Sequence, residues 1–405
     1  MENMLHLLFW FRVLLSAITV LSLSHVVAAD APAAAFCSNI ELRDGLKNCQ
    51  FQFEIRKKAT VAFMGGSITE MEGYRPLVCD LLKKMFPGTE FTFIRAGIGS
   101  TCSNTGAFRL EKDVFCKGPV DLLFVEFAVN DDQDGHFSKE ECIRGMEGII
   151  RHARLLNPDI DIVMTFFVND GMIKSYQQKK NPLSISAHEL VAALYKVPTV
   201  NVAGELTNQI EKGTMTWQQY GGVHPVATGA ALCAAMMDYL FTMAWSTPAS
   251  PTQKARSPLP QPLDPQSYFS GRFIDPKEAR IMAGWTYGVP DWTQQPKATV
   301  REQFKDIPML CASEPGAEAT LDFVGISVGA YIVSGPDSGI VNVNIDGGPP
   351  RAVNLAIGPC AVLYYPWTVI LGSGLTPGKH TLTLKMSNET KKTGHAMRIV
   401  QFAVN

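Results

Sequence analysis

The sequence predicts two domains, a parallel α/β domain followed by an all-β sandwich. Between residues 59 and 245, short apolar runs alternate with segments of helical periodicity, which is typical of a parallel sheet covered on both faces by helices. Residues 246–265 then hold six prolines and no apolar period, which indicates a linker. Beyond them apolar and polar residues alternate with a period of two, which is typical of β-strands.

The α/β domain is expected to contain five strands and five helices. The strands are predicted at residues 59–64, 91–94, 121–128, 161–168 and 198–202. The helices are predicted at residues 74–86, 106–115, 138–156, 183–195 and 227–245. Ser138 and Glu141 form a possible capping box at the start of the third helix. In such a sheet, functional residues are expected in the loops at the carboxyl ends of the strands.

The second domain is expected to begin at residue 266 and to extend to residue 405. Its strands are predicted at residues 330–333, 341–345, 352–356, 368–371, 382–386 and 397–404. The clearest alternation is Val341, Val343 and Ile345, which ends at the turn signal Asp346-Gly347. Short strands in this arrangement favour a sandwich.

The N-terminal residues 1–29 resemble a signal peptide. Arg12 precedes a short apolar core, and the small residues Val27-Ala28-Ala29 suit a signal peptidase. We therefore expect residues 30–245 to form the first mature domain and the protein to be secreted or bound to the cell envelope. The alternative is an uncleaved membrane anchor. No membrane contact is expected beyond this segment.

The overall composition is that of a globular protein. Of the 405 residues, 46% are hydrophobic and 18% are charged, and the net charge of −2 gives no reason to expect a nucleic-acid partner. Nine cysteines are present, and in an exported protein Cys37 could bridge to Cys49, or Cys102 to Cys116. Neither a C-x-x-C nor an H-E-x-x-H motif occurs, so no metal or other cofactor is predicted. The oligomeric state is left open.

The first candidate functional residue is Ser67. It follows a buried strand and the two glycines Gly65 and Gly66, and glycines permit the tight turn that exposes a nucleophile at a sheet edge. This is not the Gly-x-Ser-x-Gly elbow, because Thr69 replaces the second glycine. The alternative is a glycine turn in which Ser67 merely caps a helix.

Two further loops follow the second and third strands. The loop after the second strand contains Gly97, Gly99 and Ser100, and a backbone N–H in such a loop can stabilise an oxyanion. Asn130 and Asp131 follow the third strand, and the Asn130 amide could donate to the same oxyanion. Ordinary turns are the alternative for both loops.

His224 is the candidate general base. It lies in the glycine-rich segment 221–225, directly before the last helix of the domain, and not on an apolar helical face. That placement favours a positioned base over a structural histidine.

Together these four segments resemble the SGNH, or GDSL-like, hydrolase family over residues 59–245. The resemblance implies a three-layer, flavodoxin-like α/β/α fold with Ser67 as nucleophile and His224 as base. It also implies an oxyanion hole built from the Ser67 N–H, the N–H of Gly99 or Ser100, and the Asn130 side chain. The domain that follows is similar to the galactose-binding-like modules found beside carbohydrate-active esterases, and a structural spacer is the alternative.

The chain departs from the family pattern at three positions. Gly66 stands where aspartate is common, and Ser100 stands where glycine is usual. Gly221 replaces the aspartate that usually lies three residues before the histidine. We therefore expect either a Ser67–His224 dyad, with a backbone carbonyl of residues 217–222 orienting the imidazole, or an acid from elsewhere in the chain.

The resulting hypothesis is a secreted, metal-independent serine esterase. Its expected substrates are carboxylic esters, either small molecules or acetylated glycans, and its intermediate is acyl-Ser67. One alternative is an O-acetyltransferase with the same Ser67 and His224. The other is a carbohydrate-binding protein without catalytic activity.

Overall fold

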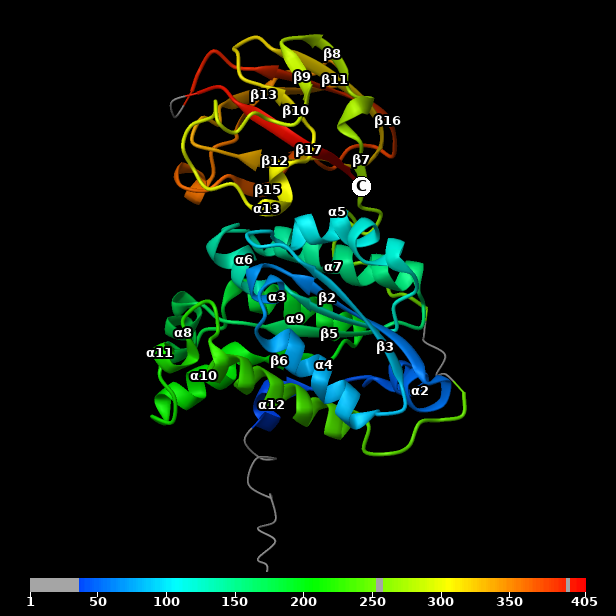
Figure 1. The fold of residues 1–405 in the computed structure, drawn as a ribbon. Coiled ribbons are helices and arrows are strands. Elements are labelled where there is room, and N and C mark those ends of the chain that lie inside the picture. Colours follow the sequence, from blue (N-terminus) through cyan, green and yellow to red (C-terminus); the bar gives the residue numbers. More distant parts are fainter. Residues whose placement is uncertain (1–35, 253–257, 391–393) are drawn as a thin grey trace, which may run out of the picture.

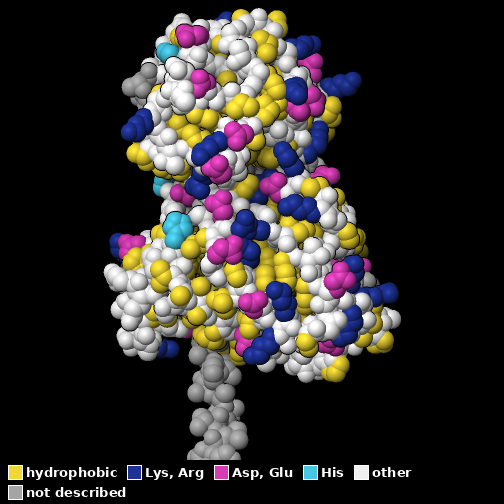
Figure 2. Space-filling view, viewed as in Figure 1, with side chains coloured by type: hydrophobic (Ala, Val, Ile, Leu, Met, Phe, Trp, Pro, Cys, Tyr) yellow, Lys and Arg dark blue, Asp and Glu magenta, His cyan; other side chains and the backbone are white. Residues whose placement is uncertain are grey.

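The computed structural model describes residues 36–252, 258–390 and 394–405, and the predicted signal peptide lies outside these residues. The described chain forms two lobes that are stacked end to end (Figure 1). On the side of the molecule shown in Figure 2, acidic and basic side chains are interspersed over both lobes.

The first domain is built on a six-stranded sheet of order β1-β6-β5-β4-β2-β3. All neighbours are parallel except β1, which is antiparallel to β6. The order reverses direction between β2 and β4, and ligands bind in open α/β sheets outside the carboxyl ends of strands at such a point. The strands are β1(Ile40–Glu41), β2(Lys58–Gly65), β3(Glu90–Gly97), β4(Leu122–Glu126), β5(Asp161–Phe166) and β6(Thr199–Asn201).

Helices cover both faces of this sheet, which confirms the predicted three-layer α/β/α architecture (Figure 1). Helices α5, α7 and α9 pack side by side on one face, and α4 and α12 pack together on the other. The main helices of the domain are α2(Lys47–Phe51), α3(Ser67–Glu70), α4(Tyr74–Met85), α5(Ser103–Asp113), α6(Ala128–Gln133), α7(Lys139–Leu156), α8(Asp170–Gln177), α9(Leu183–Tyr195), α10(Val202–Glu211), α11(Trp217–Tyr220) and α12(Ala227–Ala244).

Helix α12 is long and apolar enough to cross a membrane by length and composition alone, which the sequence analysis did not anticipate. In the structure it packs against α4, and its Leu240 and Phe241 are fully buried in the core of the α/β domain. Packing against the sheet therefore accounts for the apolar character of this helix.

The second domain is the predicted sandwich of two antiparallel sheets. One sheet has the order β15-β12-β17-β10-β9, with β7 also paired to β17, and the other has the order β14-β13-β16-β11-β8. Their inner faces enclose a separate hydrophobic core. The strands are β7(Arg272–Ile274), β8(Arg280–Ala283), β9(Trp285–Gly288), β10(Met309–Ala312), β11(Glu318–Gly325), β12(Val328–Ser334), β13(Ile340–Ile345), β14(Arg351–Asn354), β15(Tyr365–Gly372), β16(Gly378–Met386) and β17(Met397–Val404). The short helix α13(Glu302–Lys305) precedes β10.

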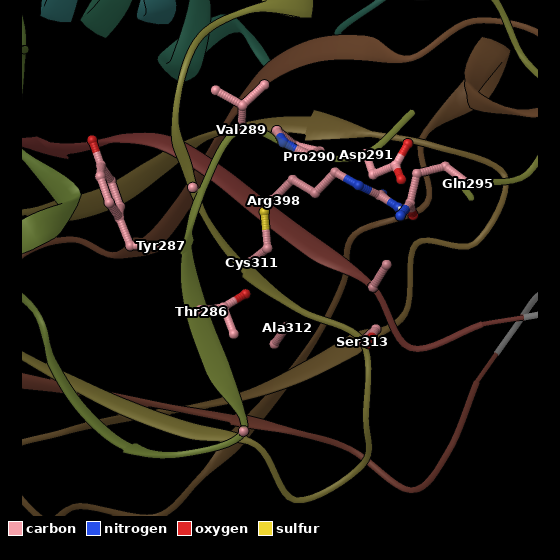
Figure 3. A pocket seen from close by; sticks show the side chains of 13 residues that line it. Thr286, Tyr287, Val289, Pro290, Asp291, Gln295, Cys311, Ala312, Ser313 and Arg398 are labelled. Atoms are coloured by element: carbon pink, nitrogen blue, oxygen red, sulfur yellow. The ribbon is translucent and has the colours of Figure 1, made fainter. Parts of the chain in front are cut away.

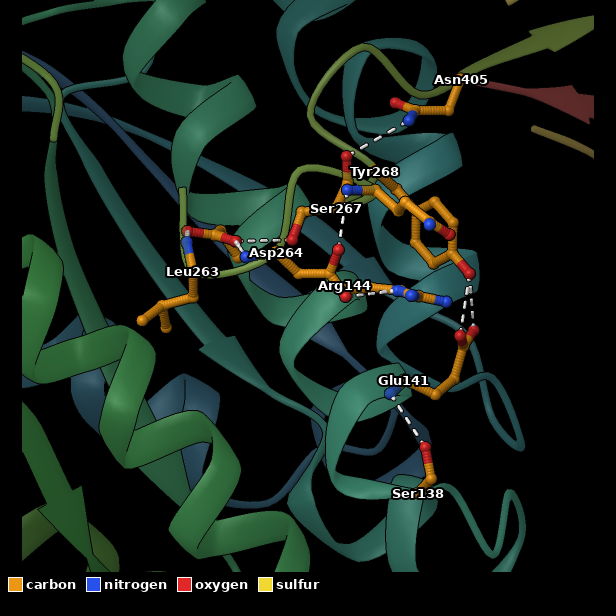
Figure 4. A network of polar contacts seen from close by, with 10 residues as sticks. Ser138, Glu141, Arg144, Leu263, Asp264, Ser267, Tyr268 and Asn405 are labelled. Carbon is orange, nitrogen blue, oxygen red and sulfur yellow. Dashed lines mark hydrogen bonds and ion pairs between the residues drawn. The ribbon is translucent and has the colours of Figure 1, made fainter. Parts of the chain in front are cut away.

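The segment that joins the domains is bound along α7 (Figure 4). The Glu147 carboxylate accepts hydrogen bonds from the Leu263 N–H at 2.7 Å, the Asp264 N–H at 3.1 Å and the Ser267 hydroxyl at 2.5 Å. Next along the chain, Tyr268 is buried against the first domain's core. The end of the predicted linker is therefore fixed to the first domain.

The start of α7 is capped by half of the predicted capping box. Ser138 Oγ accepts a hydrogen bond from the Glu141 N–H at 3.3 Å. The Glu141 carboxylate does not return the bond, because it accepts one from the Tyr268 hydroxyl instead, at 2.8 Å (Figure 4).

The two cysteine pairs considered from the sequence do not form disulfides. Cys102 is buried, with its Sγ donating to the Asn130 carbonyl oxygen, whereas Cys116 is exposed. Cys49 is likewise buried and Cys37 exposed.

Candidate active site

Ser67 lies just past the carboxyl end of β2, at the first residue of the short helix α3. Its Oγ is 2.8 Å from Nε2 of His224, which comes from the loop between α11 and α12. Ser67 is partly exposed and His224 is exposed, so a substrate can reach both side chains. A hydroxyl within hydrogen-bond distance of an imidazole is the arrangement that a nucleophile and its general base require.

A buried carboxylate that the sequence analysis missed supports the turn before Ser67. Glu126, the last residue of β4, accepts hydrogen bonds from the Gly66 N–H and from the Thr69 hydroxyl, each at 2.8 Å. A Cβ on Gly65 would lie 2.1 Å from Glu126 Oε1, so a glycine is required there. Burial raises the pKa of Glu126 to about 7, although the hydrogen bonds from Thr69 and Gly66 oppose the shift. The signal in the sequence was a carboxylate at the end of an otherwise apolar strand.

The raised pKa of Glu126 predicts a pH-dependent stability. The folded protein binds this proton more tightly than the unfolded chain, whose carboxyl has a pKa of 4.5. The resulting stabilisation is complete below that value and is lost as the pH rises to about 7. It corresponds to about 3 kcal/mol.

We expect Glu126→Gln, which stays neutral and keeps an acceptor oxygen, to lack this pH dependence. Relative to the variant, the wild type should lose about 3 kcal/mol in unfolding free energy between about pH 4.5 and pH 8, measured by denaturant titration. Glu90, an exposed carboxylate at the start of β3, is the matched control, and Glu90→Gln should follow the wild type. A constant difference between wild type and Glu126→Gln across this range would contradict the prediction.

The Asn130 side chain lies against the backbone beside Ser67. It is buried, and its Nδ2 donates to Asp134 Oδ2 at 2.7 Å, which orients the amide. Burial raises the pKa of Asp134, although the bond from Asn130 opposes this shift. A Cβ on Gly66 would lie 2.1 Å from Asn130 Oδ1, so no side chain fits at the position where the family commonly has aspartate.

The loop after β3 forms a turn, and only one of its two candidate N–H groups is available. The Gly99 N–H donates to Glu70 Oε2 at 3.0 Å. Among the hydrogen bonds of the described residues, none uses the Ser100 N–H. Ser100 has a φ of 70°, in the left-handed region that favours glycine, which explains why glycine is usual at this position.

The surroundings of His224 differ from the family pattern. Among the described residues, no carboxylate forms an ion pair with His224. The expected hydrogen bond from Nδ1 to a carbonyl of residues 217–222 is also absent there, which corrects that prediction. Gly221 has a φ of 110°, and a Cβ on it would lie 2.3 Å from the Val226 N. The backbone therefore excludes the aspartate that the family usually places there.

Asp131, which follows Asn130, belongs to a separate buried network. Its Oδ1 accepts from the Ser103 N–H at 2.8 Å, and its Oδ2 is bonded to the Ser103 hydroxyl at 2.6 Å and to His188 Nε2 at 2.9 Å. The potential ligand atoms of Asp131, Cys142 and His188 lie within 4.8 Å of one another, a cluster that the sequence spacing did not reveal. Through its hydrogen bonds with Ser103 of α5 and His188 of α9, Asp131 of α6 joins these three helices.

The sandwich has a pocket of its own, of about 300 Å³, beside strands β9 and β10 (Figure 3). Arg398 lines it, together with Tyr287 and Asp291. The guanidinium group of Arg398 is already paired with both carboxylate oxygens of Asp337, at 2.5 and 3.0 Å. The positive charge of Arg398 is therefore neutralised within the domain.

Comparisons with known proteins agree with this geometry. Residues 63–232 match the model of the GDSL-like lipase/acylhydrolase family. No curated protein matches the sequence. Among solved structures, a two-domain esterase active on acetylated mannans aligns with 20% identity and a TM-score of 0.67, over 86% of this chain and 91% of the other. The same kind of esterase co-crystallised with mannopentaose aligns with 19% identity and a TM-score of 0.66, over 86% of this chain and 90% of the other.

These alignments extend over both domains, so the two-domain fold is shared. Residues 63–232 contain Ser67, the turn at residues 98–101, Asn130 and His224. Over residues 63–232 the first domain is therefore similar to the GDSL-like lipase/acylhydrolase family, a match that supports an SGNH-type carboxylic ester hydrolase.

Proposed function

We propose that this protein is an exported carbohydrate O-acetylesterase that acts through Ser67 and His224. The observation that carries the proposal is the 2.8 Å contact between Ser67 Oγ and His224 Nε2 at the carboxyl end of the sheet. The accessibility of both side chains supports it.

In the first half of the reaction, neutral His224 accepts the Ser67 proton while Oγ attacks the ester carbonyl carbon. The tetrahedral intermediate then collapses, His224 returns the proton to the leaving sugar oxygen, and acyl-Ser67 remains. In the second half, His224 takes a proton from water, which attacks the acyl carbon, and acetate leaves as Ser67 regains its proton. No carboxylate of the described residues pairs with His224, so the transient imidazolium relies on solvent, to which His224 is exposed.

Three groups are proposed to stabilise the oxyanion. They are the Ser67 N–H at the start of α3, the Ser100 N–H and the Asn130 Nδ2 group. The Gly99 N–H is excluded because it is bound to Glu70. Donors that are fixed before the reaction cost no reorganisation as the charge develops.

We expect Asn130→Ala to lower kcat by about 100- to 1,000-fold with little change in KM, as for other losses of one oxyanion donor. Steady-state kinetics on an acetyl ester would measure this. Asn354, an exposed asparagine of β14, provides the matched control, and Asn354→Ala should behave as the wild type. A variant whose KM rises while kcat is retained would instead assign Asn130 to substrate positioning.

The proposed substrate is an acetylated polysaccharide. The predicted signal peptide would bring the protein outside the cell, and the second domain is similar to the galactose-binding-like modules found beside carbohydrate-active esterases. The aligned two-domain esterase is active on acetylated mannans, so acetylated mannan is the first polymer to test.

The test is acetate release from 4-nitrophenyl acetate, acetylated mannan and acetylated xylan by the wild type. Release from an acetylated polymer supports the proposal, and the absence of release from all three contradicts it. If acetyl groups from an added donor appear on the glycan in place of free acetate, the protein is an O-acetyltransferase. Glycan binding without any turnover would indicate a non-catalytic binding protein.

A further inference from the structure

The turn at residues 98–101 lies between the two domains. Ile98 packs against a small hydrophobic cluster of the second domain, whose buried members are Phe304, Met309, Tyr331, Val333, Tyr364 and Val400. The next three residues of the turn are buried. The conformation of this loop therefore depends on the second domain as well as on β3.

Arg301 of the second domain reaches the same turn, and Gln303 of that domain reaches Glu70 beside it. Arg301 donates from one terminal nitrogen to Ser100 Oγ at 2.7 Å and from the other to Glu70 Oε2 at 3.4 Å. Gln303 donates to Glu70 Oε1 at 3.1 Å. A Cβ on Gly99 would lie 2.5 Å from the Arg301 guanidinium, so the turn and the arginine are in close contact. Glu70 also accepts the Gly99 N–H and lies on α3, the helix that begins at Ser67.

The turn is of a type that serine disfavours. The Thr101 N–H donates to the Ile98 carbonyl oxygen at 3.3 Å, and the third residue, Ser100, has a positive φ, whereas Gly99 does not. These are the features of a type II turn, which prefers glycine at its third position. A type I turn would relieve Ser100, but it rotates the central peptide by about 180°. That rotation would direct the Ser100 N–H away from its present side and replace it with the Gly99 carbonyl.

We propose that Arg301 is a positioning residue that holds this turn in its type II form, so that the Ser100 N–H is available to the oxyanion. The inference rests on the proposed function. The hydrogen bond to Ser100 Oγ offsets the backbone preference of serine. The contact with Glu70 secures the acceptor of the Gly99 N–H. The second domain thus completes the oxyanion hole of the first.

The experiment is a double-mutant cycle in the full chain between Arg301→Ala and Ser100→Gly. Arg301→Ala should lower kcat by about 10- to 100-fold, the range expected when a catalytic donor is misplaced, and should leave KM within about twofold. In the Ser100→Gly background the same substitution should cost less than about threefold, because glycine accepts the positive φ without help. Arg280→Ala removes an exposed arginine of β8 that pairs with Asp322, and it should match the wild type.

The outcomes separate this inference from the proposed function. Suppose that the wild type shows turnover that depends on Ser67. An unchanged kcat in folded Arg301→Ala, or an equal loss of kcat in both backgrounds, would then overturn this inference and leave the proposed function standing. A wild type without such turnover would overturn the proposed function and this inference with it. Should Arg301→Ala fail to fold, Arg301→Lys keeps the charge but not the two-armed contact, and the same cycle applies, with a smaller loss expected.

Discussion

Replacing Ser67 with alanine should lower kcat by about 10⁶-fold, the loss seen when a serine hydrolase is deprived of its nucleophile. Alanine cannot form the acyl intermediate, and the remaining donors can only assist attack by water. The substitution removes one partly exposed oxygen, so the fold should be retained. Steady-state hydrolysis of 4-nitrophenyl acetate by the purified variant would measure the effect, with thermal unfolding as the check on folding.

Ser175, a partly exposed serine of α8, is the matched control, and Ser175→Ala should hydrolyse the ester at the wild-type rate. Activity of Ser67→Ala within about tenfold of the wild type would rule out acyl transfer through Ser67. Trapping offers an independent readout. A phosphonate ester inhibitor should add covalently to the wild type and not to Ser67→Ala, as intact-mass measurement would show.

Replacing His224 with alanine should lower kcat by about 10⁴- to 10⁶-fold, because His224 is the one base of the described residues that is hydrogen-bonded to Ser67 Oγ. No acid variant should approach this loss. Asp131 is bound to Ser103 and His188, and Asp132 accepts a hydrogen bond from Asn169, so neither is paired with His224.

The comparison should therefore use Asp131→Asn, Asp132→Ala and Glu211→Ala beside His224→Ala. Each acid variant should retain kcat within about tenfold of the wild type. Asparagine is used at residue 131 because alanine would leave a cavity at this buried position. A folded acid variant that loses as much activity as His224→Ala would show that an acid completes a displaced triad. The dyad would then be wrong.

Sequence periodicity was sufficient where an element buries one continuous apolar pattern. Helix α9 begins and ends at the predicted residues. By contrast, β8 is exposed along its whole length, so no alternation of buried and exposed side chains marks it. The predicted strand at residues 121–128 was too long, because the apolar residues after Glu126 are buried in the start of α6.

In the candidate site, too, residues with a local sequence signal could be predicted and residues that depend on tertiary contacts could not. Ser67, Asn130 and His224 could be named from the sequence because each lies in a short local segment with glycine or turn residues around it. The contact between Arg301 and Ser100 joins residues 201 positions apart, and no periodicity relates them. Glu126 was overlooked because its role depends on strand order, which places the end of β4 beside the end of β2.

The turn at Gly221 also bears on how this active site can change over generations. A substitution to aspartate would place a side chain against the Val226 backbone nitrogen in a conformation that favours glycine, so a single codon change cannot restore a triad. Recovery of the acid would require the loop before α12 to be rebuilt first. The missing aspartate is thus tied to the backbone conformation of this loop, and not to the choice of one side chain.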